Sequence, residues 1–337
     1  MKKYLKMTKI EQAKREYIDW TDAIGINSIE KLNSALREGR GSQLINLCEA
    51  RQERRFVEIA SAIYEARDRV RIMMLSGPSS SGKTSSSRRI AQQLMVLGLK
   101  PKVIELDNYF VDRELTPRDE NGEYDFEALE AMNVKLLCEH LNAMMAGEEV
   151  ELPKFDFAKG CSGPSGKRMR LDEGEILVME GIHALNPALT PGIDRSCMFM
   201  VYVSALTALH YRDNLKRRST SDKRLLRRIV RDSRTRGISP EDNILRWASV
   251  RRGEEKNIFP YEENADIMFN SSVLYDLPLL KYYAEPLLYG IRETSPAYEK
   301  ARFLLGYLSD IRAFTPAEIA LVPPTSIMRE FIGGQML

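Results

Sequence analysis

The chain has 337 residues, of which 43% are hydrophobic and 29% are charged, and its formal net charge is only +2. This length is sufficient for about two domains with a large core, and so small a net charge gives no overall signal for binding a polyanion. No apolar run approaches the roughly 18 residues of a membrane span, and there is neither a secretory signal nor a C-x-x-C pair, so we expect a cytoplasmic protein with reduced thiols and without a zinc site.

Residues 1–66 are predicted to be helical throughout. Apolar side chains recur at spacings of three and four residues, as in Ile29, Leu32 and Leu36. The glycines of the Gly39-Arg-Gly41 segment are predicted to separate two of these helices. We interpret the stretch as a helical segment that packs on the core of the protein.

Strands and helices begin to alternate after Arg69. An apolar strand at 70–75 precedes a Gly/Ser-rich turn and a helix from Lys83 to about Leu97. Such alternation predicts βαβ units and a mostly parallel sheet that is covered on both faces. The further predicted elements are strands at 102–106, 175–179 and 198–203, a helix at 127–145 and a loop at 160–166.

Residues 77–84, GPSSSGKT, match the phosphate-loop pattern G-x-x-x-x-G-K-[ST] in full. The two glycines allow backbone N–H groups to face phosphate oxygens, while Lys83 reaches the β and γ phosphates and the Thr84 hydroxyl can bind magnesium. The helix that begins here adds the positive end of its dipole. The predicted ATP-binding residues of this loop are Gly77, Pro78, Ser79, Ser80, Ser81, Gly82, Lys83, Thr84 and Ser85.

Two carboxylates follow predicted strands. Asp107 could accept the proton of an attacking hydroxyl or approach magnesium, although by itself it is also typical of a turn or helix cap. Glu180 follows an apolar strand and precedes Gly181, which is typical of a magnesium-directed acid in phosphate-loop enzymes. Since ligands of parallel sheets bind at the carboxyl ends of the strands, both carboxylates are expected beside the phosphate loop.

Residues 212–236 are dense in arginine and lysine. An apolar stripe within this stretch, formed by Leu225, Leu226, Ile229 and Val230, leaves a basic face on the other side. A solvated face, a helix that closes over a triphosphate and a surface for nucleic acid are the three uses that this pattern allows.

The order of these segments resembles the uridine kinase/phosphoribulokinase family. The resemblance is carried by the phosphate loop, the strand-end Asp107, Tyr124-Asp125-Phe126, the segment 153–157, the segment 179–182 and the basic segment 224–232. Residues 249–260 and 323–334 are similar to a bacterial nucleoside kinase branch, so the resemblance covers about 30–337. Longer members of that branch carry a region similar to part of threonyl-tRNA synthetase, which we expect this chain to lack.

The resemblance implies an α/β phosphate-loop kinase core at about 67–290, with a helical N-terminal segment at 1–66 and a helical C-terminal tail at 291–337. It implies that Asp107 is the catalytic base and surrounds magnesium together with Thr84 and Glu180. The other roles that it implies are ribose binding by Asp125, contact with the base or its neighbourhood by Phe155, and a lid formed by Arg228 and Arg231, with Arg236 as a further ATP-binding residue. Asp107, Lys83, Arg228 and Arg231 are then the catalytic set.

The expected function is magnesium-dependent transfer of a phosphoryl group from ATP or another NTP to the 5′-hydroxyl of a uridine- or cytidine-like nucleoside. Two departures leave the base open, because the segment 155–160 contains no histidine and Ile238 stands where family members often have arginine. His183 follows the Glu180 motif and is interpreted as structural. A kinase of a sugar phosphate or pantothenate-like acid and an RNA-associated NTP-binding regulator are the alternatives. Neither a membrane nor a nucleic acid is the expected partner, and a homo-oligomer is left open.

Overall fold

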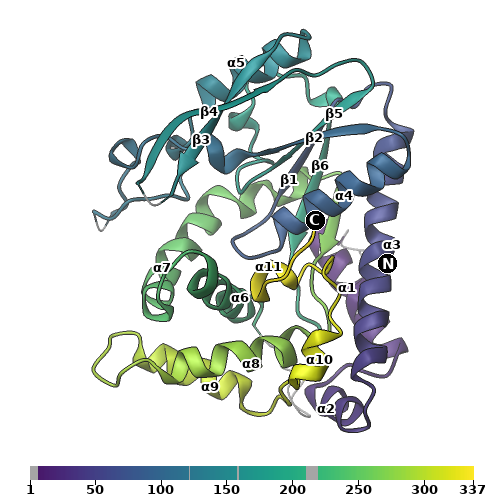
Figure 1. Ribbon diagram of the computed structural model, residues 1–337, viewed down its shortest axis with the longest axis vertical. Coiled ribbons are helices and arrows are strands. Elements are labelled where there is room, and N and C mark those ends of the chain that lie inside the picture. Colours follow the sequence, from purple (N-terminus) through teal and green to yellow (C-terminus); the bar gives the residue numbers. More distant parts are fainter. Residues whose placement is uncertain (1–6, 121, 158, 210–218) are drawn as a thin grey trace, which may run out of the picture.

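A five-stranded parallel sheet lies at the centre of the computed structural model, which describes residues 7–120, 122–157, 159–209 and 219–337. The strand order is β2-β5-β1-β6-β7, and each neighbouring pair is parallel (Figure 1). The strands are β1 (Ile72–Ser76), β2 (Lys100–Glu105), β5 (Glu175–Glu180), β6 (Met198–Ser204) and β7 (Ile267–Asn270). The predicted α/β class and the mostly parallel sheet are confirmed, while β7 was not predicted.

Alternate side chains of each strand enter two different hydrophobic clusters, because successive residues of a strand point to opposite faces. On one face, Met73 and Leu75 of β1 belong to the cluster that includes apolar residues of the helices named next. These helices are α3 (Gly41–Glu65), α4 (Lys83–Val96), α6 (Thr220–Thr235), α7 (Pro240–Asn257) and α8 (Asp276–Tyr289). On the other face, Ile72 and Met74 pack with α5 (Val134–Met145) and with a two-stranded hairpin.

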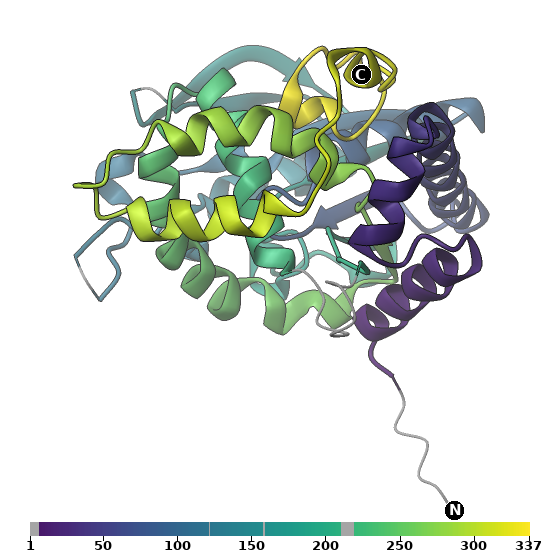
Figure 2. The same ribbon diagram turned by 90° about the horizontal axis from the view of Figure 1, so that it is seen from below.

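Helices from the N-terminal and C-terminal parts of the chain share the first hydrophobic cluster. The first cluster contains Leu32 and Phe56 from the N-terminal helices together with Leu304 and Phe331 from the C-terminal segment. Figure 2 shows the yellow C-terminal segment beside the purple N-terminal helices, and Ser326 Oγ donates a hydrogen bond to Glu49 Oε1 (2.9 Å). The remaining helices are α1 (Lys9–Ala23), α2 (Ile29–Arg37), α9 (Tyr298–Ser309), α10 (Pro316–Ala320) and α11 (Arg329–Ile332).

The helical prediction for the N-terminal segment is confirmed for the part of it that the structure describes. Thr8 caps α1, and Gly39 has a φ of +77° between α2 and α3, where the helix break was predicted. None of the helices within the described ranges combines the length and the apolar character that crossing a membrane requires. The three predicted chain divisions stay predictions, since the first hydrophobic cluster draws side chains from all of them.

The predicted loop at 160–166 is wrong for all but its first residue, because residues 161–166 belong to strand β4 (Cys161–Met169). It pairs antiparallel with β3 (Val150–Asp156), which was not predicted either. β4 is mostly exposed and contains Gly163 and Pro164, so its sequence lacks the apolar alternation of a half-buried strand. Backbone pairing with β3 forms the strand instead, and a proline is tolerated there because the hairpin has free edges.

The helix predicted at 127–145 begins only at Val134. The preceding residues form a short 3₁₀ turn at Leu129–Ala131, and Met132 makes a β-bridge with Phe110. Asn133 then caps the helix, because its side chain accepts a hydrogen bond from the Leu136 N–H (3.1 Å). Residues 129–132 therefore lie beside the segment that follows β2 and do not belong to the helix.

Candidate active site

The phosphate loop leaves β1 and enters α4 through a backbone path that its glycines allow. A Cβ atom at Gly77 would overlap the Val203 carbonyl oxygen of the neighbouring strand, so the close approach needs glycine. Gly82 lies in the left-handed region with a φ of +88°, and Ser80 also has a positive φ of 58°. These turns coil the loop around the N-terminus of α4, as the sequence pattern predicts.

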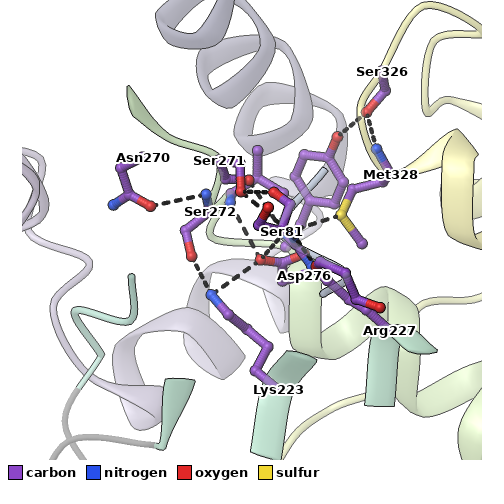
Figure 3. A network of polar contacts seen from close by, with 12 residues as sticks. Ser81, Lys223, Arg227, Asn270, Ser271, Ser272, Asp276, Ser326 and Met328 are labelled. Carbon is purple, nitrogen blue, oxygen red and sulfur yellow. Dashed lines mark hydrogen bonds and ion pairs between the residues drawn. The ribbon is translucent and has the colours of Figure 1, made fainter. Parts of the chain in front are cut away.

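Three carbonyl groups of the loop accept hydrogen bonds from side chains of other parts of the chain. Arg224 Nε donates to the Ser79 carbonyl oxygen (2.9 Å), Arg227 Nη1 donates to that of Ser80 (3.5 Å), and the Ser271 hydroxyl donates to that of Ser81. Figure 3 shows Ser271 and Arg227 around Ser81. Bound carbonyls keep their negative ends away from a phosphate, whose anionic oxygens suit the N–H groups of such a loop.

The two arginines of α6 that hold the loop, Arg224 and Arg227, belong to buried ion pairs, and Lys223 joins one of these pairs. Arg227 donates from Nη2 to both carboxylate oxygens of Asp276 (2.8 Å each), and Lys223 Nζ lies 3.2 Å from the same carboxylate. Arg224 pairs with Glu254, which also accepts a hydrogen bond from the Ser79 N–H (3.0 Å). The predicted apolar stripe of this basic stretch is buried, whereas its residues 212–218 lie outside the described part of the chain.

The two predicted lid arginines, Arg228 and Arg231, and the further ATP-binding candidate Arg236 converge on the buried carboxylate of Asp232. Its oxygens lie 2.8 Å from Arg231 Nε, 3.5 Å from Arg228 Nε and 3.7 Å from Arg236 Nε. Arg228 also donates from Nη1 to the hydroxyl of Ser79 in the phosphate loop (2.9 Å). The predicted arginines are therefore held together as one group beside the loop, since a shared acceptor reduces their mutual repulsion.

Asp107 and Glu180 stand at the carboxyl ends of β2 and β5, the two strands on one side of β1. Thr84 donates from its hydroxyl to Glu180 Oε1 (2.7 Å), and Lys83 Nζ donates to the Pro78 carbonyl oxygen (3.3 Å). Burial raises the pKa of Glu180 to about 7, with the charge of Lys83 opposing the shift. Burial also raises the pKa of Asp107, and the charges of Lys83 and Arg236 counteract it.

The oxygen atoms of Thr84, Asp107 and Glu180 fit magnesium, which prefers hard oxygen ligands. Within the described ranges, no group of three or more His, Cys, Asp or Glu side chains is arranged to hold a metal ion. Such a site suits magnesium that is bound largely through triphosphate and water, with one or two carboxylates added by the protein.

Asp125 lies at the edge of a cavity of about 300 Å³. Asp125 Oδ1 accepts a hydrogen bond from the Glu127 N–H (3.1 Å), which orients the carboxylate in a tight turn. The cavity carries acids and bases in equal number. It is lined by Arg118, Asp119, Glu120, Asp125, Ser249, Arg252, Gly253 and Lys256.

Phe155 is buried, with 8% of its surface exposed, and it packs edge-on against Phe110 and Phe157 at centroid distances of 5.7 and 5.1 Å. Phe157 is the exposed member of this cluster at 56%, and the guanidinium of Arg236 lies 5.8 Å from its ring centroid. Sequence reasoning named Phe155 as the aromatic near the base. Phe157, two residues later, is the more exposed ring of the two.

Glu127 and Glu254 are two site carboxylates that sequence reasoning missed. Among the described residues, Glu127 Oε2 is buried without a hydrogen-bond partner, and burial with the nearby Glu254 raises the pKa of Glu127 to about 7. A Cβ at Gly253 would overlap Glu127 Cβ, so this glycine admits the side chain. The spacing of Glu127, two residues after Asp125, was a signal that could have indicated it. His183 is buried, and its structural interpretation stays a prediction.

Residues 72–277 of the chain match the model of the phosphoribulokinase / uridine kinase family. A uridine kinase of Chloroflexus aurantiacus is 28% identical over 199 residues, which cover 59% of this chain and 85% of that protein. One of Halobacterium salinarum is 28% identical over 195 residues, which cover 58% and 77%. A solved structure of a candidate fructose transport system kinase from a Silicibacter species is 18% identical, with coverage of 64% and 98% and a TM-score of 0.42.

Proposed function

The chain belongs to the phosphoribulokinase / uridine kinase family, and we propose that it transfers the γ-phosphoryl group of ATP or another NTP to the 5′-hydroxyl of a nucleoside. Family membership makes the chain a phosphotransferase with a small alcohol acceptor. The observation that carries the finer proposal is the meeting of three features at one edge of the sheet. The phosphate loop, Asp107 and Glu180 follow the neighbouring strands β1, β2 and β5.

In the proposed reaction, Asp107 accepts the proton of the acceptor hydroxyl. The hydroxyl oxygen forms a bond to the γ-phosphorus while the bond from that phosphorus to the β–γ bridging oxygen breaks, which releases the nucleoside diphosphate. Lys83 lies beside the transferred group and balances its negative charge. Arg228 and Arg231, which share Asp232 as an acceptor, supply further positive charge as the transition state forms. Positioning and charge therefore supply most of the catalysis.

Thr84, Asp107 and Glu180 would hold magnesium, whose charge lowers the repulsion between the triphosphate and the attacking oxygen. The carboxyl group of Glu180 already accepts a hydrogen bond from Thr84, so both ligands are oriented before the metal binds. The raised pKa of Glu180 makes metal binding compete with protonation near neutral pH, because the ligand form is the carboxylate.

Nucleoside binding is supported by Asp125, which lines the cavity together with Gly253. The residue after Gly253, Glu254, accepts a hydrogen bond from the Ser79 N–H of the phosphate loop. A carboxylate can accept hydrogen bonds from two neighbouring hydroxyl groups, which suits the ribose diol. The aromatic cluster of Phe155 and Phe157 lies on the β3–β4 side of the site and offers a surface for a base. These features favour a nucleoside and do not select its base.

The test is transfer from several NTP donors to a panel of nucleosides in the presence of magnesium, with wild type and Asp125→Asn. If Asp125 binds the ribose diol, the variant should raise the KM for the nucleoside by about 10-fold or more, since a charged hydrogen bond contributes about 1.5–3 kcal/mol. The KM for the donor should change little. An equal loss of affinity for both substrates would assign Asp125 a structural role, and no transfer to any nucleoside would reject the acceptor class.

A second candidate acceptor is a small alcohol that carries an anionic group, such as a sugar phosphate or a pantothenate-like acid. The cavity beside Asp125 favours it, because Arg118, Arg252 and Lys256 line that cavity. Arg252 already pairs with Asp119 at 3.2 Å, so Lys256 is the sharper probe. Lys256→Ala should weaken an anionic acceptor selectively, whereas a neutral nucleoside should be unaffected.

An RNA-associated NTP-binding regulator is less well supported by the basic stretch than the sequence alone indicates. Lys223, Arg224 and Arg227 are buried and paired with carboxylates, so these charges do not form a solvent-facing surface. Release of the diphosphate product separates the classes: nucleosides should stimulate it in a kinase, and RNA should stimulate it in a regulator. The small-molecule partner and the cytoplasmic location remain predictions.

A further inference from the structure

The C-terminal segment of the chain, residues 323–337, lies against the first turn of α4, where the phosphate loop ends. This segment is outside the range 72–277 that matches the family model, so the family match assigns it no role. Figure 1 shows α11 and the C-terminus beside α4 and α6. Its contacts with the loop come from two polar side chains, Glu330 and Gln335, and from the apolar Ile327.

Ser85 is the loop residue that these polar side chains contact. Glu330 Oε2 accepts hydrogen bonds from the Ser85 N–H (3.2 Å) and from its hydroxyl (2.5 Å), and Gln335 Nε2 donates to the same hydroxyl oxygen (2.7 Å). The next N–H along the helix, that of Ser86, already donates to the Gly82 carbonyl oxygen (3.0 Å). Ser85 therefore carries the last N–H of α4 that has no partner within the helix.

In a phosphate loop, the N–H groups at this helix end cradle the α and β phosphates of the nucleotide. In the structure, Glu330 Oε2 accepts a hydrogen bond from one of those N–H groups, that of Ser85. Both ligands are anionic oxygens that the positive end of the helix dipole attracts, so each suits the same position. They cannot both occupy it, because two anions at hydrogen-bond distance from one N–H would repel each other.

Glu330 is held in this place by a well-packed segment. Met328, Phe331 and Ile332 are buried in the first hydrophobic cluster, and the Arg227 guanidinium lies 4.9 Å from the Phe331 ring centroid. A Cβ at Gly82 would come within 2.7 Å of Ile327 Cγ2, so the segment also closes on the loop itself. Since its backbone is anchored in the core, we expect the Glu330 side chain to move rather than the whole segment.

We propose that Glu330 occupies the position of a donor α-phosphate oxygen when the nucleotide site is empty, and that the donor displaces its carboxylate from Ser85. The inference rests on the proposed function only in taking residues 77–85 as the donor phosphate site. Glu330 then acts as a built-in competitor that weakens the binding of every nucleotide with an α-phosphate. It has no such effect on a nucleoside, which lacks that group.

The experiment measures equilibrium binding to the full chain in magnesium buffer without an acceptor. The ligands are adenosine, AMP and ADP, with guanosine, GMP and GDP as a second series. The proteins are wild type, Glu330→Gln and Glu299→Gln, an exposed glutamate of α9 that provides the same change in charge away from the loop. Glu330→Gln should bind the mono- and diphosphates about 10-fold more tightly, as expected for removing one like charge from a partly exposed anion site. Binding of the nucleosides should not change, and Glu299→Gln should behave as wild type.

Unchanged or weaker binding of the phosphorylated ligands by folded Glu330→Gln would overturn the competition, and weaker binding would make Glu330 a donor ligand instead. A wild-type protein that binds none of the phosphorylated ligands would reject the phosphate-loop function as well, so the two failures are distinguishable. If Glu330→Gln does not fold, Glu330→Ala tests the same inference, because it also removes the carboxylate from Ser85. Glu330→Ala should bind ADP more tightly than wild type, and unchanged binding would contradict the proposal.

Discussion

Asp107 and Glu180 end neighbouring strands but differ in their contacts. Glu180 is bound to Thr84, whereas Asp107 lies in the 3₁₀ turn Leu106–Tyr109 under the charges of Lys83 and Arg236. A base acts mainly in the transition state, so Asp107→Asn should lower kcat and kcat/KM together by about 10²–10⁴-fold. Single-turnover transfer at saturating ATP, magnesium and acceptor measures this loss. A rate within about threefold of wild type would remove Asp107 from the mechanism.

Glu127 provides a prediction about pH. Its pKa of about 7 in the folded chain lies above the ordinary value near 4.5, so between these values the folded state keeps a proton that the unfolded state releases. The free energy of unfolding should therefore fall as pH rises from 5 to 8, and Glu127 should account for about 1–3 kcal/mol of that loss. Glu127→Gln, which stays neutral, should match wild type at pH 5 and exceed its stability at pH 8.

Urea unfolding of both proteins at pH 5, 6.5 and 8 measures this difference. Glu180 also has a raised pKa near 7 and contributes in the same direction in both proteins, so its effect cancels in the comparison. A constant difference in unfolding free energy across the three pH values would show that Glu127 does not titrate in this range.

Helix α6 carries buried structural arginines, such as Arg227, and the predicted lid arginines Arg228 and Arg231. Arg227 is fully buried and bound to both oxygens of Asp276, so removing it leaves that carboxylate with Lys223 and the Val273 N–H as partners. Arg227→Met should lower the free energy of unfolding by about 3 kcal/mol, the lower part of the range for breaking a buried pair. Arg246→Met changes an exposed arginine of α7 and should stay within about 0.5 kcal/mol. Denaturant unfolding compares the two, and similar small losses would contradict the structural role of the Arg227–Asp276 pair.

Elements with a local signature could be predicted from the sequence, and elements that depend on distant partners could not. The phosphate loop and α4 follow from spacing and glycine content alone. In contrast, β4 is a strand because β3 pairs with it, and α5 starts at Val134 because Met132 bridges to Phe110. The same limit applies to the site. Asp107 and Glu180 were predicted from strand ends, whereas the contact of Glu330 with Ser85 joins residues that are far apart in the chain.

At the scale of the whole molecule, one hydrophobic cluster joins the N-terminal helices, the sheet and the C-terminal segment through residues such as Phe56, Val201 and Phe331. Parts that share a core lose their packing together, so we expect a single cooperative unfolding transition. Far-ultraviolet circular dichroism, tryptophan fluorescence and loss of nucleotide binding should give the same midpoint in urea. Separate midpoints would indicate that the predicted segments at 1–66 and 291–337 unfold independently.

The strand order also determines when the sheet can form during synthesis. β1 is at the centre, and its neighbours come from much later in the chain, since Ile72 pairs with Leu177 on one side and with Met198 on the other. An apolar strand therefore leaves the ribosome long before either partner exists, and pairing between distant segments is slow. Nascent chains that stop before β6 should expose β1 and aggregate or recruit chaperones, whereas chains that extend past β7 can bury it.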